Sequence, residues 1–175
     1  MQVDSGDSTA GRGSSPGKRI GTSEWFLIDQ ARINKFADAT EDWNPLHVDP
    51  DWCREKSPFK TTISFGFLTL SLLTHLTEKI LKDSGELNHE GASYTLNYGL
   101  DRVRFVTPVP VNTRIRCQLT LLESQQRKPG QILQRFSAVV EIENQQRPAL
   151  TAEWLGLHVS DSAVRSEQAN AEQEP

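Results

Sequence analysis

An aspartate and a histidine on either side of a short turn are the residues of this sequence best suited to acid–base chemistry. They are Asp42 and His47, separated by Asn44-Pro45, which interrupts a helix because proline disfavours helical backbone in the residue before it. A turn here can bring the carboxylate and the imidazole to one side of a cleft, where the two could polarise one water molecule. General acid–base addition of water to a double bond needs such a pair. The alternative is that Asp42 caps a helix and His47 is an ordinary loop histidine.

A glycine at the head of the most apolar segment is a second feature that could take part in chemistry. Gly66 opens a predicted helix that ends near Gly85 and has apolar groups on nearly every side, which predicts that it is buried. Free backbone N–H groups in its first turn could stabilise developing negative charge, and glycine lets a substrate carbonyl approach closely. The alternative is that Gly66 only starts a tightly packed helix.

Short helices are predicted on both sides of the Asp42–His47 turn. Asp29 is a typical N-cap for a helix whose apolar residues follow helical spacing up to the Asn44-Pro45 break. Asp49-Pro50 then begins a second short helix, which ends at 57–59. The turn that carries the two candidate residues is therefore held between two helices.

Alternation of apolar and polar residues after Gly85 predicts an antiparallel sheet. The predicted strands cover 93–100, 103–106, 113–121, 132–142 and 150–159, with a further strand at 24–28 before the first helix. One long buried helix beside one antiparallel sheet indicates an α+β domain in which the sheet wraps around the helix.

Composition limits the remaining possibilities. The 175 residues suit one domain, and segments 1–21 and 160–175 are predicted to be disordered tails, the second acidic, around a folded domain at 22–159. A net charge of −4 indicates neither a nucleic-acid nor a membrane-surface partner, and no apolar run is long enough to span a bilayer. Two cysteines and the absence of a signal peptide favour a cytoplasmic protein with reduced thiols.

Two motifs resemble the MaoC-like dehydratases, which include the (R)-specific enoyl-CoA hydratases. The first is Asp42-x-Asn44-Pro45-x-His47-x-Asp49-Pro50, and the second is Ile63-x-x-Gly66-Phe67-Leu68-Thr69-Leu70. The segment Asn97-Tyr98-Gly99-Leu100-Asp101-x-x-Arg104-Phe105 resembles the branch of this family that contains nodulation protein N. The similarity extends from Trp25 to Val159, which is nearly the whole predicted domain.

The resemblance implies a hot-dog fold and a homodimer with active sites near the subunit interface. It implies addition of water to trans-2-enoyl thioesters, or dehydration of (R)-3-hydroxyacyl thioesters. Asp42 and His47 then form the acid–base pair, and the backbone N–H of Gly66 is the oxyanion donor to the thioester carbonyl. Asn44 becomes a polar support of the loop, and Thr74 a support near the catalytic carboxylate. Phe65 stands where the family usually has histidine, and it is predicted to be an apolar pocket wall.

No cofactor is expected, because the substrate is carried as a thioester of CoA or acyl carrier protein. The sequence has no glycine-rich nucleotide loop and no metal-ligand cluster. Arginines of the predicted sheet could bind the phosphates of the carrier, or they could instead line the solvated face of the sheet. These are Arg102, Arg104, Arg114 and Arg116.

Two other functions fit the same fold, since fold alone does not fix activity. The first is a non-catalytic protein that binds acyl thioesters, which the unusual Phe65 favours. The second is a thioesterase, which needs a carboxylate that activates water at the carbonyl carbon. The pairing of Asp42 with His47 argues against the thioesterase.

Overall fold

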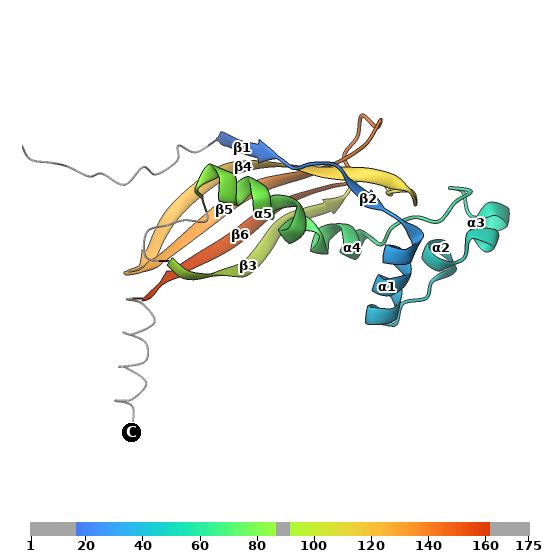
Figure 1. The fold of residues 1–175 in the computed structure, drawn as a ribbon, viewed down its shortest axis with the longest axis horizontal. Coiled ribbons are helices and arrows are strands. Elements are labelled where there is room, and N and C mark those ends of the chain that lie inside the picture. The colour runs from blue at the N-terminus through green and yellow to red at the C-terminus, as the bar shows by residue number, and fades with distance from the viewer. Residues whose placement is uncertain (1–16, 87–91, 162–175) are drawn as a thin grey trace, which may run out of the picture.

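A six-stranded antiparallel sheet curves around a helix in the computed structural model, which describes residues 17–86 and 92–161 (Figure 1). The helices are α1 (Gln30–Thr40), α2 (Pro45–Val48), α3 (Pro50–Lys56), α4 (Gly66–Ser71) and α5 (Leu73–Ser84). The strands are β1 (Lys18–Thr22), β2 (Phe26–Ile28), β3 (Ala92–Phe105), β4 (Thr113–Lys128), β5 (Gln131–Ile142) and β6 (Leu150–Ser160). Within these described ranges, no helix is long and apolar enough to cross a membrane.

The sheet has the strand order β1-β4-β5-β6-β3, and β2 also pairs with β4. Every second residue of β4 from Ile115 to Leu121 is fully buried, and each pairs with an inward apolar residue of β5. These side chains share one core with Leu76 and Ile80 of α5. The predicted α+β architecture is confirmed, because period-two alternation places one face of each long strand against the helix.

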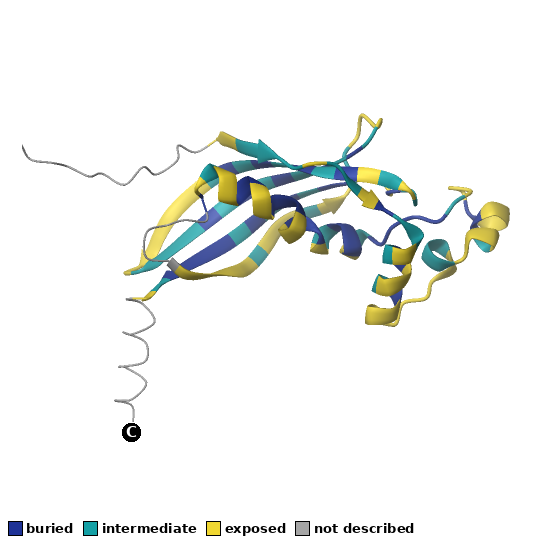
Figure 2. Cartoon of the chain, in the orientation of Figure 1, coloured by how far each residue is buried: buried dark blue, intermediate teal, exposed yellow. Residues whose placement is uncertain are grey.

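The predicted long helix is divided at Leu72 into α4 and α5, but its backbone hydrogen bonds run across the division. Leu72 N–H donates to the Leu68 carbonyl at 3.0 Å, and Leu76 N–H donates to the Leu72 carbonyl at 2.9 Å. Gly85 ends α5 in the left-handed conformation, with φ +77°. The prediction of burial on nearly every side is wrong for the outward face, because the sheet covers only the other side (Figure 2).

Three short helices, α1 to α3, lie together at one end of the sheet (Figure 1). Each begins at a side-chain cap, as the sequence predicts for α1 and α3. Asp29 accepts from Arg32 N–H and Asp49 accepts from Trp52 N–H, both at 2.8 Å. Asn44 accepts from Leu46 N–H at 3.0 Å, so the predicted helix break also starts the single turn of α2.

The domain boundaries and two strands differ from their predictions. The prediction that residues 18–21 belong to a disordered tail is wrong, because they form β1. This segment pairs with β4, and Gly21 packs against Ile80. At the other end β6 extends to Ser160, one residue into the predicted second tail. Residues 1–16 and 162–175 of the two predicted tails lie outside the described residues. The predicted strands 93–100 and 103–106 form one strand, β3, which is irregular near Arg102, where φ is +51°.

Candidate active site

His47 lies in α2 with one ring nitrogen fixed by the backbone. Its Nδ1 is 2.8 Å from the carbonyl oxygen of Ile63. A carbonyl oxygen can only accept, so Nδ1 carries a proton. In the neutral imidazole Nε2 is therefore the acceptor, and it is the nitrogen that can take a proton from water.

The loop that carries His47 is attached to the segment before α4 by further hydrogen bonds. Ile63 N–H donates to the Leu46 carbonyl at 3.2 Å. Gln30 Nε2 donates to the His47 carbonyl at 2.8 Å, and Gln30 Oε1 accepts from the Thr62 hydroxyl at 2.6 Å. Gln30 could not be selected from the sequence, because no local pattern indicates that a glutamine after a helix cap will hydrogen-bond to two distant segments.

Phe65 lies beneath the His47 ring rather than in a pocket wall. The two ring centroids are 3.8 Å apart with an interplanar angle of 31°, and the Phe36 ring lies 5.2 Å from Phe65. Only 4% of Phe65 is exposed. The predicted role as pocket wall is therefore not observed, because Phe36 of α1 and His47 of α2 enclose the ring.

A cavity of about 300 Å³ brings His47 and Gly66 together, as the two sequence motifs predict. Its lining consists of His47, Ile63, Ser64, Gly66, Phe67, Thr69, Phe105, Thr107, Pro108, Val109 and Ala149. Ser64 N–H donates to the Val109 carbonyl at 2.8 Å, which attaches the segment before α4 to the segment after β3. Gly66 is the first residue of α4, so its N–H belongs to the first turn of a helix.

Asp42 lies in the turn between α1 and α2, before the helix that carries His47. It is exposed, and one carboxylate oxygen accepts from Asn44 N–H at 3.2 Å. It follows the left-handed residue Glu41, which ends α1 with φ +56°. Asp42 is not among the described residues that line the His47 cavity. The structure therefore places Asp42 and His47 on one turn, with only the histidine inside the cavity, while Asn44 supports the loop by capping α2.

Thr74 lies two helical turns beyond Gly66 and lines a different hollow. It is exposed on α5, and its hydroxyl donates to the Ser71 carbonyl at 3.2 Å. It contributes to two cavities of about 170 Å³ and 200 Å³, which also share Asn97 and Trp154. We call these two cavities together the α5–β3 trough. The support of the Asp42 carboxylate by Thr74 stays a prediction, since the hydrogen bond that Thr74 makes is to the backbone of its own helix.

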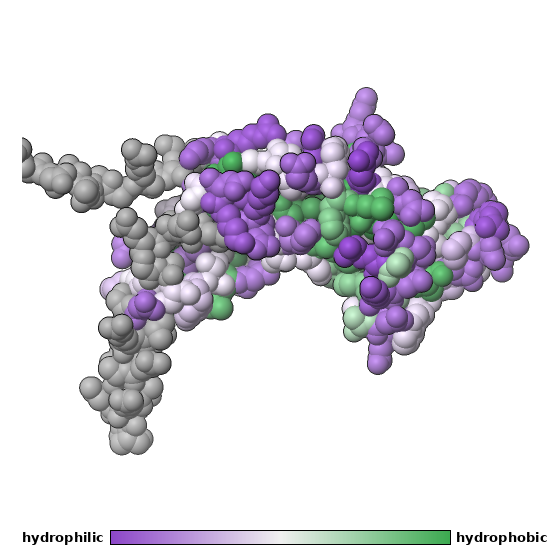
Figure 3. Space-filling model, in the orientation of Figure 1, coloured by the Kyte–Doolittle hydropathy of each residue, from purple (hydrophilic) through white to green (hydrophobic). Residues whose placement is uncertain are grey.

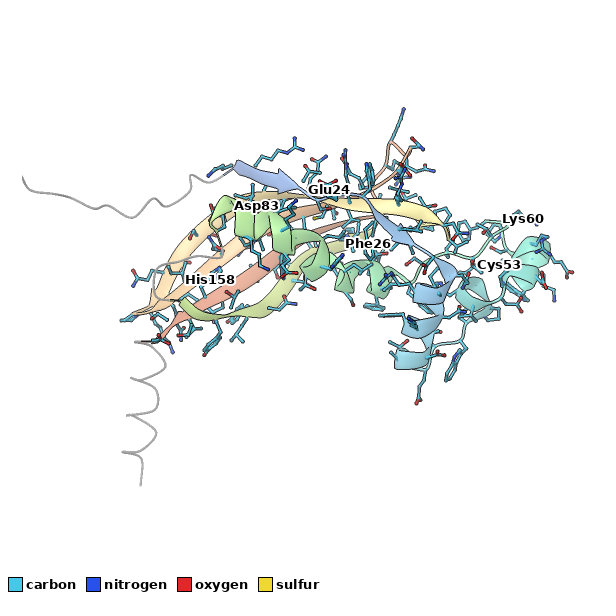
Figure 4. All side chains as sticks on the ribbon, in the orientation of Figure 1. Glu24, Phe26, Cys53, Lys60, Asp83 and His158 are labelled. Atoms are coloured by element: carbon cyan, nitrogen blue, oxygen red, sulfur yellow. The ribbon has the colours of Figure 1, made fainter. Side chains whose placement is uncertain are left out.

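The α5–β3 trough reaches a buried polar group, and among the described residues its lining shares no member with the lining of the His47 cavity. Phe67 lines the His47 cavity, and Ser71, one turn later, lines the trough. At the far end the Nδ1 atom of His158 is 2.9 Å from the Thr95 hydroxyl, and its Nε2 atom is 2.7 Å from Gln134 Oε1. Figure 4 labels His158 on the sheet. Figure 3 shows hydrophobic side chains gathered near α4, whereas the outward face of α5 is hydrophilic.

Three of the four candidate arginines form ion pairs, and both cysteines are buried. Arg102, Arg114 and Arg116 form ion pairs with glutamates of neighbouring strands or of the turn after β5, which favours the interpretation that they line the solvated face of the sheet.

Both cysteines are buried free thiols. Burial raises the pKa of Cys117 to about 12, and it also raises the pKa of Cys53. Neither thiol is therefore suited to act as a thiolate nucleophile.

Comparisons with known proteins agree with this architecture. The family model of the MaoC like domain matches residues 12–144. Nodulation protein N of Rhizobium meliloti is 41% identical over 141 residues, covering 81% of this chain and 84% of the relative. The 3-hydroxyacyl-thioester dehydratase Z of Mycobacterium tuberculosis is 36% identical over 154 residues, covering 88% of this chain and 97% of the relative.

A solved structure shows the same fold. The (R)-hydratase from A. caviae superposes with a TM-score of 0.64 at 21% identity, covering 83% of this chain and 97% of that chain. The sheet wrapped around α5 is thus a hot-dog fold, as the resemblance implies. On the family model and these relatives, the chain belongs to the MaoC-like domain family.

Proposed function

We propose that this protein is a hydro-lyase that adds water to trans-2-enoyl thioesters or removes it from (R)-3-hydroxyacyl thioesters. The observation that carries the proposal is the shared cavity of His47 and Gly66, in which Nε2 is the acceptor nitrogen of the histidine. The relative named 3-hydroxyacyl-thioester dehydratase supports the same chemistry. The reaction needs no cofactor beyond the CoA or acyl carrier protein that carries the acyl group.

His47 takes the first proton in the proposed hydration. Water loses a proton to Nε2 while its oxygen bonds to C3 of the enoyl group, and the electron pair of the double bond moves toward the thioester oxygen. The N–H of Gly66 stabilises this oxyanion. Asp42 orients the same water. The proton held on Nε2 of His47 then passes to C2 as the carbonyl re-forms, which returns the imidazole to its neutral form. The elements of water are thereby added across the double bond, and dehydration is the reverse.

The acyl chain is proposed to lie in the α5–β3 trough. With the thioester carbonyl at the Gly66 N–H, the acyl chain extends along the helix past Phe67 toward Thr74. Phe67 lines the His47 cavity, and Thr74 lines the trough. Thr74 is eight residues beyond Gly66, which corresponds to about 12 Å of helix. Long acyl chains would therefore pass Thr74, and short ones would end before it.

A homodimer formed through β3 is part of the proposal. β3 ends the strand order of the sheet, and its exposed large side chains are Tyr94, Leu96, Tyr98, Leu100 and Phe105. An edge strand with exposed apolar residues is normally covered by another chain or element. Pairing of two β3 strands would cover these residues and place Phe105, which lines the His47 cavity, near the interface. Light scattering of the purified protein should give twice the chain mass, and a monomer at micromolar concentration would contradict this part.

The activity test uses the purified protein with trans-2-enoyl-CoA substrates of several chain lengths. Loss of the conjugated thioester absorbance should follow, and the product should be the (R)-3-hydroxyacyl-CoA on chiral separation. The His47→Gln variant is the control for contaminating hydratases. An inert wild-type protein, or an (S) product, would overturn the proposal.

A non-catalytic protein that binds acyl thioesters is the second candidate. The exposure of Asp42 outside the cavity favours it, because catalysis requires that carboxylate to reach the bound water. Binding of enoyl-CoA without turnover, measured by calorimetry, would select this candidate. A thioesterase has less support, since no Asp or Glu is among the described residues lining the His47 cavity.

A further inference from the structure

We infer that Phe65 is a positioning residue for His47, a role that rests on the proposed function. The rings are in contact in a tilted arrangement, with centroids 3.8 Å apart and an interplanar angle of 31°. The hydrogen bond from Nδ1 to the Ile63 carbonyl fixes one edge of the imidazole. Phe65 supports one of its faces, so the edge and the face contacts together restrict both side-chain rotations of His47.

Phe65 is itself held rigidly, which a positioning residue requires. Its ring is almost fully buried, and the Phe36 ring lies 5.2 Å away. The carbonyl of Phe65 accepts from Thr69 N–H at 3.2 Å and from the Thr69 hydroxyl at 3.3 Å. The phenyl ring is therefore held by contacts from α1 and α2, and the backbone of Phe65 is attached to α4.

The position of Phe65 in the chain also links it to the proposed oxyanion donor. It is the N-cap residue of α4, directly before Gly66. The peptide bond between these two residues carries the N–H that is proposed to bind the thioester oxygen. One residue therefore connects the proposed base with the proposed oxyanion donor. A change that moves Phe65 alters the separation of the two groups, and misplacement by about 1 Å can cost on the order of 10²-fold in rate.

The test compares Phe65→Leu with Phe36→Leu in the full chain. Both changes remove an aromatic ring from the same cluster, but of the two only Phe65 stacks on His47. Phe65→Leu should lower kcat by tenfold or more with KM changed less than threefold. Phe36→Leu loosens the support behind Phe65 but leaves the Phe65 ring against His47, so it should lower kcat by a factor at least three times smaller than Phe65→Leu does, at a similar loss of melting temperature. The inference is overturned if the two variants lose equal kcat.

A spectroscopic measurement keeps the inference testable without turnover. The ¹⁵N signals of the His47 ring, assigned by comparison with His47→Gln, should show one tautomer protonated at Nδ1 in the wild type. In Phe65→Leu they should show a mixture of tautomers, and an unchanged single tautomer would count against the inference. If the wild type is inert but Phe65→Leu changes the tautomer, the proposed function fails while the positioning role stands.

Phe65→His provides the conservative variant in case the leucine variant does not fold. A planar ring at this position can still stack on His47, so this variant should retain more kcat than Phe65→Ala at comparable solubility. If Phe65→Ala is as active as Phe65→His, stacking is not what positions His47, and the inference is wrong.

Discussion

The ring of Phe105 lies so close to the backbone of Gly66 that a Cβ atom on Gly66 would be 2.9 Å from its Cδ1 atom. Phe105 comes from the end of β3, and 51% of it is exposed. The glycine thus lets an aromatic side chain from a distant strand close one side of the His47 cavity.

Gly66→Ala should displace Phe105 rather than unfold the protein, because the obstructing atoms belong to a partly exposed side chain. The shifted ring and the new methyl group both narrow the cavity, so kcat/KM should fall by roughly ten- to a hundredfold. Steady-state kinetics and the melting temperature measure the two effects separately. The double variant Gly66→Ala/Phe105→Ala should be no slower than Phe105→Ala alone; a further loss would place the damage at the glycine backbone itself.

His47→Gln and Asp42→Asn should each lower kcat by about 10²–10⁴-fold with the fold intact. The effects should not add in the double variant, because both residues act on one water molecule in the proposed mechanism. Circular dichroism checks the fold, and enoyl-CoA hydration measures the rate. Near-full activity of either single variant would remove that residue from the proposed acid–base pair.

Gln30→Ala should destabilise the protein by about 1–3 kcal/mol, because it leaves the buried Thr62 hydroxyl without its acceptor. Urea denaturation at fixed protein concentration measures this free energy of unfolding. The matched control is Gln30→Ala/Thr62→Val, which also removes the Thr62 hydroxyl and should recover part of the lost free energy of unfolding. If the double variant is less stable than Gln30→Ala, the Thr62 contact is not the source of the cost.

Thr74→Phe should block the α5–β3 trough without disturbing the core, since Thr74 is exposed and lines both of its cavities. Activity toward 2-dodecenoyl-CoA should fall at least tenfold relative to crotonyl-CoA, because only the longer chain passes residue 74. Thr74→Ser is the control and should leave the ratio unchanged. An equal loss for both substrates would show that the acyl chain does not follow the trough.

The sequence alone determined the features that depend on neighbouring residues. Alternation in 113–121 and 132–142 predicts the strands because opposite faces of a strand meet different environments. Asp29 and Asp49 predict helix starts because their side chains reach N–H groups within one turn. His47 and Gly66 could be selected from their motifs, and the structure brings both to one cavity.

Only the tertiary structure decided features that depend on distant partners. β1 forms because Lys18–Thr22 lies beside β4, about a hundred residues later, although its own composition resembles a tail. Phe65 was predicted to line a pocket, but rings from α1 and α2 enclose it. Gln30 hydrogen-bonds to both His47 and Thr62, and Thr74 lines cavities between α5 and β3. Such contacts are set by packing between elements, which local residue patterns do not encode, because many partners satisfy the same pattern.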